Sequence, residues 1–140
     1  MATLAEEREY LESELRSYRY IVDQCYRWEQ VIVNAEIAIY GVSSPHAKDV
    51  IYENAGDPYE CKYNSLYEDI KKAKVQLLIW QPRRQWIEER LGTLNQEEYQ
   101  VIKYYYMLKQ SQDWIADVLQ IGRRTVQRRI DKALEKMLNF

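Results

Sequence analysis

The sequence has few of the residues that interrupt helices. Its 140 residues include only four glycines and three prolines. No stretch alternates β-branched and polar residues over the length of a strand, so β-structure has little to begin from. An all-α fold is therefore expected.

Residues that bind metals or form cross-links are also scarce. Cys25 and Cys61 lie 36 positions apart without a Cys-x-x-Cys pair, and His46 is the only histidine. These residues do not assemble into a zinc ligand set or a disulfide framework. We expect no metal site and no cofactor, and two thiols of this kind suit a reducing compartment.

Long apolar runs are missing as well. The longest falls far short of the ~20 residues that a membrane span requires. The first nine residues hold several acids and no apolar segment typical of a secretion signal. We therefore expect a cytoplasmic protein that makes no contact with a membrane.

The sequence offers little that would support catalysis. The acidic pairs Glu88-Glu89 and Glu97-Glu98 are adjacent, and neighbours on a helix point in different directions. Three consecutive tyrosines, residues 104–106, have no activating Arg or His cluster near them in the sequence, which favours core packing. Without a Gly-rich phosphate loop or a nucleophile-base arrangement, an enzyme is not expected.

Charge is present in quantity and is unevenly distributed. Residues 1–60 hold twelve acidic and five basic residues, whereas residues 123–140 hold two acidic and six basic residues, although the whole chain carries only −2. Binding of a polyanion depends on the local potential of one face rather than on net charge. The basic carboxyl-terminal segment therefore indicates nucleic-acid binding despite the acidic total.

The amino-terminal part shows a heptad seam. Apolar or small residues recur at every seventh position: Leu4, Leu11, Tyr18, Cys25, Ile32 and Ile39. A second stripe runs through Leu15 and Val22 and then shifts to Trp28 and Ala35. This pattern predicts a helix from about residue 4 to residue 40, ended by Gly41, that packs lengthwise against another helix.

A second long helix is predicted after a connector at residues 41–58, which contains Pro45 and His46. Its apolar positions keep a spacing of three and four: Tyr63, Leu66, Ile70, Ala73, Leu77, Trp80, Ile87 and Leu91. Pro82 lies within this run, so the helix either kinks there, which the unbroken rhythm favours, or begins anew. Residues 1–92 would then form a coiled-coil-like helical arm, either as an antiparallel hairpin or exchanged between two chains.

The seam of this arm is explained most simply by internal packing. It also offers a surface for a homodimer, because DNA-binding modules gain affinity when two half-sites are joined.

Residues 93–140 have the pattern of a helix-turn-helix. Asn95 and Glu98 form a capping-box signature for a helix at about 96–108. Its predicted apolar face uses Tyr99, Val101, Ile102, Tyr105, Tyr106 and Leu108.

Ser111 is the predicted cap of a second short helix at about 112–119. Its predicted buried face comprises Trp114, Ile115, Ala116 and Leu119. A three-residue turn, Gln120-Ile121-Gly122, then leads into the last helix, and its length suits the motif.

The last helix, at about 123–138, has an apolar side and a basic side. Five positions fall in one arc and are predicted to be buried: Val126, Ile130, Ala133, Leu134 and Met137. Since a recognition helix inserts its amino-terminal half into the major groove, we expect Arg123, Arg124, Gln127 and Arg128 near base edges. Phosphate contacts are expected from Arg129, Lys132 and Lys136, and Thr125 belongs to the same candidate set. The competing interpretation is a basic face that only keeps the protein in solution.

These segments resemble region 4 of sigma-70-type factors. The resemblance rests on Leu94-Asn95-Gln96-Glu97-Glu98, Trp114-Ile115-Ala116-Asp117-Val118-Leu119 and Thr125-Val126-Gln127-Arg128-Arg129, and it covers about residues 94–138. More narrowly, the chain is similar to the small RinA/ArpU-type regulators of phages and prophages. That similarity implies activation of late phage genes, contact with host RNA polymerase and a place in the cytoplasm of a bacterial host.

The sequence departs from the family pattern at two positions. Gln120 stands where the turn commonly has Gly, and Gly122 stands where Ser or Thr usually caps the recognition helix.

Two other functions stay open: a phage small terminase subunit that marks DNA for packaging, and an adaptor whose helical hairpin binds a protein partner.

Overall fold

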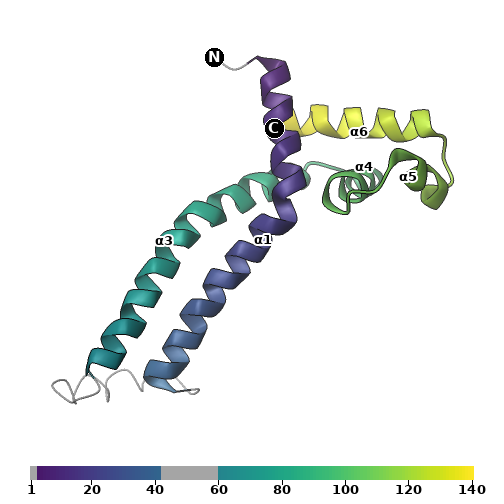
Figure 1. Ribbon diagram of the computed structural model, residues 1–140. Helices are drawn as coiled ribbons and strands as arrows, with labels where there is room; N and C mark the ends of the chain where they lie inside the picture. Colours follow the sequence, from purple (N-terminus) through teal and green to yellow (C-terminus); the bar gives the residue numbers. More distant parts are fainter. Residues whose placement is uncertain (1–2, 42–59) are drawn as a thin grey trace. The chain divides into compact units, whose positions relative to one another are not determined.

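All regular secondary structure in residues 3–41 and 60–140, which the computed structural model describes, is helical. Side chains in the second stretch are described from residue 63, so the connector after Gly41, with His46, and the Cys61 side chain lie outside the description. The elements are α1 (Leu4–Tyr40), α3 (Glu60–Leu91), α4 (Gln96–Ile102), the π-helical turn η1 (Lys103–Met107), α5 (Gln112–Leu119) and α6 (Arg123–Leu138) (Figure 1). The predicted all-α fold is confirmed.

None of the described helices carries an apolar stretch long enough to cross a membrane.

The chain divides into two compact units. One contains residues 1–21 and 82–140, and the other contains residues 22–81. The start of α1 and the end of α3 thus share a unit with the three carboxyl-terminal helices. This grouping by contact differs from the functional division into residues 1–92 and 93–140, which stays a prediction.

The heptad seam of α1 is buried along most of its length. Leu11, Cys25 and Ile39 are buried, and Gly41, at φ +85°, ends the helix by donating its N–H to the Ile37 carbonyl at 2.8 Å. The prediction for Leu4 was wrong, because this side chain is 70% exposed. Leu4 is the first residue of the helix and lines an open groove beside Leu134, so most of its surface meets solvent.

In the unit of residues 22–81, α1 and α3 lie side by side and form a helical hairpin (Figure 1). Ala35, Ile39 and Ile70 form its buried cluster. The partly buried side chains packed against this cluster are Ile32, Tyr40, Tyr63, Leu66 and Tyr67. The hydroxyls of Tyr40 and Tyr67 lie 3.1 Å apart, which satisfies both polar groups at the edge of the cluster.

Helix α3 runs without interruption through Pro82. Proline has no backbone N–H, so the carbonyl of Leu78 loses its partner within the helix. Both residues are exposed, and water can bond this carbonyl instead. Of the two predicted alternatives, a new helix beginning at Pro82 is wrong.

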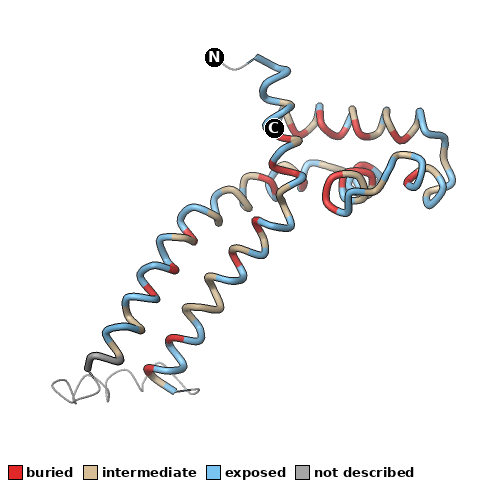
Figure 2. The backbone as a smooth tube through the Cα atoms, viewed as in Figure 1, coloured by how far each residue is buried: buried red, intermediate tan, exposed pale blue. Residues whose placement is uncertain are grey.

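The unit of residues 1–21 and 82–140 has its own core, to which α1 contributes Leu11, Leu15 and Ile21. Buried residues recur at every turn of α6 (Figure 2). A charged residue also lies inside: the buried Glu14 carboxylate accepts two hydrogen bonds from Arg83, at 2.7 and 3.1 Å. This bidentate pair joins α1 to α3, and the sequence pattern did not indicate it.

Candidate nucleic-acid interface

The first helix of the motif begins as predicted. The Asn95 side chain accepts from the Glu98 N–H at 2.9 Å, and the Asn95 N–H donates to Glu98 at 3.0 Å. The helix predicted at 96–108 is α-helical only to Ile102 and continues as the π turn η1, in which Leu108 donates its N–H to the Lys103 carbonyl. This wider turn shifts the register by one residue.

Two residues expected on the buried face of this helix are exposed. Tyr99 is 38% exposed and Leu108 is 36% exposed. Leu108 follows the π turn, which rotates it away from the core. Tyr99 lies in the α-helical part, where a tyrosine can pack its ring while its hydroxyl reaches water.

Tyr106 joins this helix to α1. Its ring is buried, and its hydroxyl donates to Glu12 at 2.9 Å. Burial raises the pKa of Tyr106, and the hydrogen bond to the Glu12 carboxylate raises it further. The phenol therefore stays protonated and acts as a structural donor.

Helix α5 begins as predicted, with the Ser111 hydroxyl accepting from the Trp114 N–H at 3.1 Å. Ile115 is fully buried, whereas Ala116 and Leu119 are half-buried. Trp114 was expected on the buried face but is 39% exposed. Its ring packs edge-on against Tyr104 at 5.4 Å instead of entering the core.

The turn between α5 and α6 contains a residue in the left-handed conformation. Gln120 has φ 55° and ψ 48°, and the Ile121 N–H donates to the Ala116 carbonyl at 3.0 Å. Gly122 lies at the start of α6 with extended backbone and no side-chain cap. The turn therefore forms despite both departures from the family pattern.

The buried face of α6 matches the prediction at all five positions: Val126, Ile130, Ala133, Leu134 and Met137. On the opposite face Arg124 and Arg128 are exposed in the first half of the helix. The second half of that face carries Asp131 and Glu135. The amino-terminal half of α6 is therefore the part suited to an anionic ligand.

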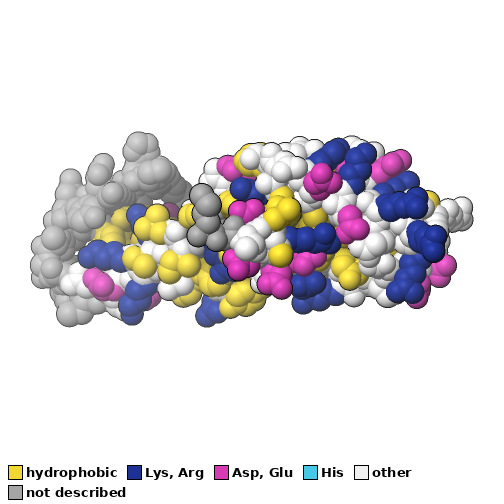
Figure 3. Space-filling view, turned by 90° about the horizontal axis from the view of Figure 1, so that it is seen from above, with side chains coloured by type: hydrophobic (Ala, Val, Ile, Leu, Met, Phe, Trp, Pro, Cys, Tyr) yellow, Lys and Arg dark blue, Asp and Glu magenta, His cyan; other side chains and the backbone are white. Residues whose placement is uncertain are grey.

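Basic side chains gather over the end of this unit that α5 and the start of α6 form (Figure 3). Arg123 approaches Asp113 at 3.6 Å in a highly exposed pair, and Arg129 approaches Glu97 at 3.7 Å. Among the described residues, Arg124 and Arg128 form no ion pair with an acid. Because an exposed ion pair contributes little to stability, Arg123 can exchange Asp113 for a phosphate at small cost.

The remaining candidate residues of α6 are placed as follows. Lys132 is exposed, whereas Thr125 and Gln127 are half-buried.

Lys136, expected to contact phosphate, is engaged inside the unit. Its ammonium donates to the buried Glu98 carboxylate at 2.7 Å. Burial pushes the pKa of Glu98 up, but the hydrogen bonds from Lys136 and from the Asn95 N–H outweigh burial and leave the pKa below 4.5. Lys136 thus fixes α6 on the start of α4.

The sequence did not reveal a polar network around Gln127. Gln112, at the start of α5, donates to the Gln127 carbonyl oxygen, and Gln127 donates to Asp131 at 3.0 Å. Arg8 of α1 donates to the same Asp131 oxygen at 2.9 Å. No periodic pattern connects residues so far apart in the chain.

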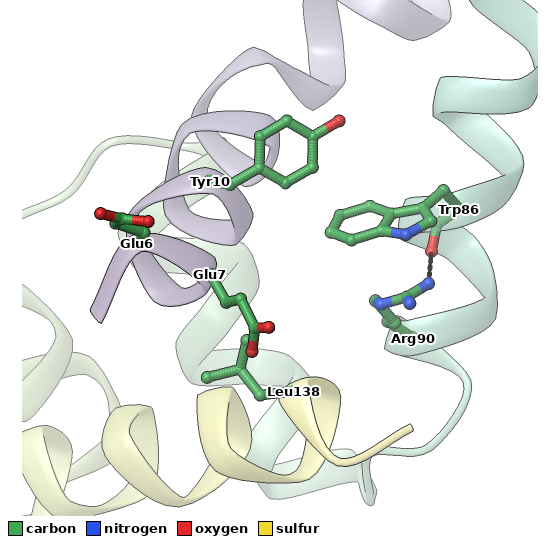
Figure 4. Close-up of a pocket in the computed structure, with 6 residues that line it drawn as sticks. All are labelled: Glu6, Glu7, Tyr10, Trp86, Arg90 and Leu138. Carbon is green, nitrogen blue, oxygen red and sulfur yellow. Dashed lines mark hydrogen bonds between the residues drawn. The ribbon is translucent and has the colours of Figure 1, made fainter. Parts of the chain in front are cut away.

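A groove of about 490 Å³ opens at the other end of α6. It lies between the start of α1, the end of α3 and Leu138 (Figure 4). Tyr10 meets Trp86 edge-on at 5.2 Å, and the Arg90 guanidinium lies 3.9 Å from the centroid of Trp86. Glu6 and Glu7 also line this groove, so it is not suited to nucleic acid.

The comparisons with known proteins bear on this unit. Residues 90–137 match the family model described as Sigma-70, region 4. No curated protein and no solved structure gave a match. The matched residues include the capping box, the left-handed turn and nearly all of α6. The carboxyl-terminal part of the chain is therefore a sigma-70 region 4-like helix-turn-helix, a DNA-binding domain.

Proposed function

We propose that the protein is a sequence-specific transcriptional regulator that binds duplex DNA through the amino-terminal half of α6. One observation carries the proposal. Arg124 and Arg128 lie exposed on the outer face of a helix whose opposite face is fully anchored, while the acids Asp131 and Glu135 are confined to its second half. The first two turns of α6 are therefore the part of its outer face best suited to enter a groove of a polyanion.

Within this proposal the residues have different roles. Arg123, Arg124, Gln127 and Arg128 face base edges, where arginine pairs with guanine and glutamine with adenine. Arg129, Lys132 and Thr125 face the phosphate backbone, and their contacts set affinity rather than sequence preference. The proposal assigns no catalytic step to any residue.

The first test is a titration of labelled late-promoter DNA over a series of salt concentrations. Counterion release predicts a log-log slope of about −0.9 for each phosphate neutralised. The double variant Arg124→Ala/Arg128→Ala should lose its preference for the promoter over random duplex while its circular dichroism spectrum stays unchanged.

The matched control is Lys72→Ala/Lys74→Ala, which removes the same charge from exposed positions of α3. This variant should keep both the slope and the sequence preference. A salt-independent signal from the wild-type protein would contradict DNA binding, and a preference that survives in the arginine variant would contradict the assigned base contacts.

We further propose that the target genes are late genes of a phage or prophage and that regulation is activation through host RNA polymerase. The similarity of the helix-turn-helix segments to RinA/ArpU-type regulators supports this narrower role. Transcription from a late promoter with purified host polymerase tests it, since an activator raises transcript yield and a protein of another kind does not.

The helical arm is proposed to contact another protein chain, in the first instance a second copy. Exposed apolar side chains on its two helices support this role: Val33, Ile37, Val75, Leu78 and Ile79. Light scattering separates the alternatives. A dimer fits the regulator, a ring of eight or more subunits would favour DNA packaging by a terminase subunit, and capture of a partner without any DNA shift would favour an adaptor.

A further inference from the structure

We propose that Asp131, Gln112 and Arg8 are positioning residues that orient the Gln127 amide to recognise adenine in the major groove. This inference rests on the proposed function. It adds a specificity-determining residue, Arg8, that lies in α1 and outside the matched helix-turn-helix.

The geometry is a chain of hydrogen bonds through the recognition helix. The Gln127 side chain accepts from Gln112 Nε2 and donates to Asp131 Oδ1 at 3.0 Å. The same Oδ1 accepts from the Arg8 guanidinium at 2.9 Å. These two hydrogen bonds hold the Gln127 amide from both sides, and the side chain is half-buried.

The carboxylate decides which way the amide faces. An ionised Asp131 can only accept hydrogen bonds, so Gln127 must present its NH2 group to it and not its oxygen. A flipped amide would place two oxygen atoms against each other beside a negative charge. The carbonyl oxygen of Gln127 is thereby directed toward Gln112.

The hydrogen-bonding groups of the Gln127 amide that its protein contacts leave unused match the major-groove edge of adenine. A glutamine side chain has two N–H donors and two lone pairs, and the two described contacts use one of each. One donor and one acceptor are left for a ligand. Adenine offers the complementary acceptor, N7, and donor, the N6 amino group, at its major-groove edge.

Arg8 gives this arrangement its stability. The Arg8 guanidinium lies 3.6 Å from the Glu12 carboxylate and 2.9 Å from the Asp131 carboxylate, so it is held between two acids. Its charge also offsets that of Asp131, which would otherwise repel phosphates next to the reading half of α6. Because the network fixes Gln127 before binding, less side-chain entropy is lost on the DNA.

The test measures base discrimination. After a preferred site has been selected from random duplexes, each adenine is replaced in turn by 7-deazaadenine, which lacks the N7 acceptor. For the wild-type protein, one position should lose affinity by about fivefold to tenfold. We call the affinity for the unmodified site divided by that for the 7-deazaadenine site the N7 ratio. This ratio should fall to one in Gln127→Ala and close to one in Asp131→Ala and Arg8→Ala. The affinity of Asp131→Ala for the unmodified site should fall by less than the wild-type N7 ratio, because the substitution also removes an acid near the phosphates.

Three controls keep the inference testable. Glu135→Ala removes an acid from the same face of α6, and Arg19→Ala removes an exposed base from α1; both should keep the wild-type ratio. Asp131→Asn retains the side-chain shape but can donate as well as accept, so it no longer fixes the Gln127 amide and should lower the ratio. This variant replaces Asp131→Ala if the alanine variant does not fold.

The outcomes separate this inference from the proposed function. A ratio kept by folded Asp131 and Arg8 variants but lost in Gln127→Ala overturns the positioning role while DNA reading by α6 stands. A selected site at which no adenine shows a ratio above one overturns adenine recognition by Gln127. Absence of any selected site would instead reject the proposed function itself.

Discussion

At the scale of single residues, Glu98 ties the end of α6 to the start of α4. Its carboxylate accepts from the Asn95 N–H at the start of α4 and from Lys136 near the end of α6. One buried acid thus caps one helix and anchors another. The sequence predicted the cap, but it gave no sign that Lys136, expected to contact phosphate, would instead pair with this buried acid.

Glu98→Gln should destabilise the protein at neutral pH by about 1 to 3 kcal/mol, because a buried charge-assisted contact is lost. The folded-state pKa of Glu98 lies below 4.5, so its contribution is present above that pH and disappears as the pH falls through the lowered value. Urea unfolding at several pH values should therefore show less acid sensitivity in the variant below pH ~4.5.

The control for this measurement is Glu97→Gln, which removes the neighbouring, exposed carboxylate. Its effect should stay within about 0.5 kcal/mol. Equal effects of the two substitutions would show that Glu98 does not anchor α6.

At the scale of elements, the turn between α5 and α6 stores backbone strain. Gln120 adopts a left-handed conformation that glycine accepts more readily than any other residue. The turn nevertheless keeps the length that the motif requires, so α6 begins at Arg123 as the sequence predicted.

Gln120→Gly should stabilise the protein by about 1 kcal/mol, because the strain of the left-handed residue is removed. Thermal unfolding followed by circular dichroism measures the effect. The matched control, Asp117→Gly, places glycine at an exposed α-helical position of α5 and should destabilise by about 1 kcal/mol. A destabilised Gln120→Gly variant would mean that the glutamine side chain supports the turn in a way that its backbone conformation does not explain.

At the scale of the whole molecule, the helix-turn-helix shares its compact unit with the start of α1. Leu11 and Leu15 of α1 are buried in the unit that contains α4, α5 and α6. The start of the chain should therefore share in the stability of the carboxyl-terminal helices.

Leu11→Ala should lower the free energy of unfolding of this unit by about 2 to 5 kcal/mol, since a fully buried side chain is truncated. Hydrogen exchange at the amides of α6 should accelerate accordingly. Leu4→Ala makes the same change at a position of the same seam that is 70% exposed, and it should leave exchange in α6 nearly unchanged. If α6 exchanges at the wild-type rate in Leu11→Ala, residues 93–140 fold independently.

Short-range patterns predicted most of this architecture. The seam of α1, the capping box at Asn95, the cap at Ser111 and the buried face of α6 follow from spacing and residue type within one helix. The exposure of Trp114 and the π turn at Lys103–Met107 depend on packing between helices, which spacing does not encode. The partners of Arg8 and Lys136 were missed for the same reason, since hydrogen bonds between distant segments leave no periodic trace.

The contacts of Tyr106 limit how the carboxyl-terminal helices can be transferred to another protein. The acceptor of its hydroxyl, Glu12, belongs to the opposite end of the chain, as does Arg16, whose guanidinium lies over the Tyr106 ring. A graft of residues 93–140 onto a foreign scaffold would remove both the acceptor of this phenol and the cation over its ring. A graft that keeps these contacts must therefore also carry the start of α1.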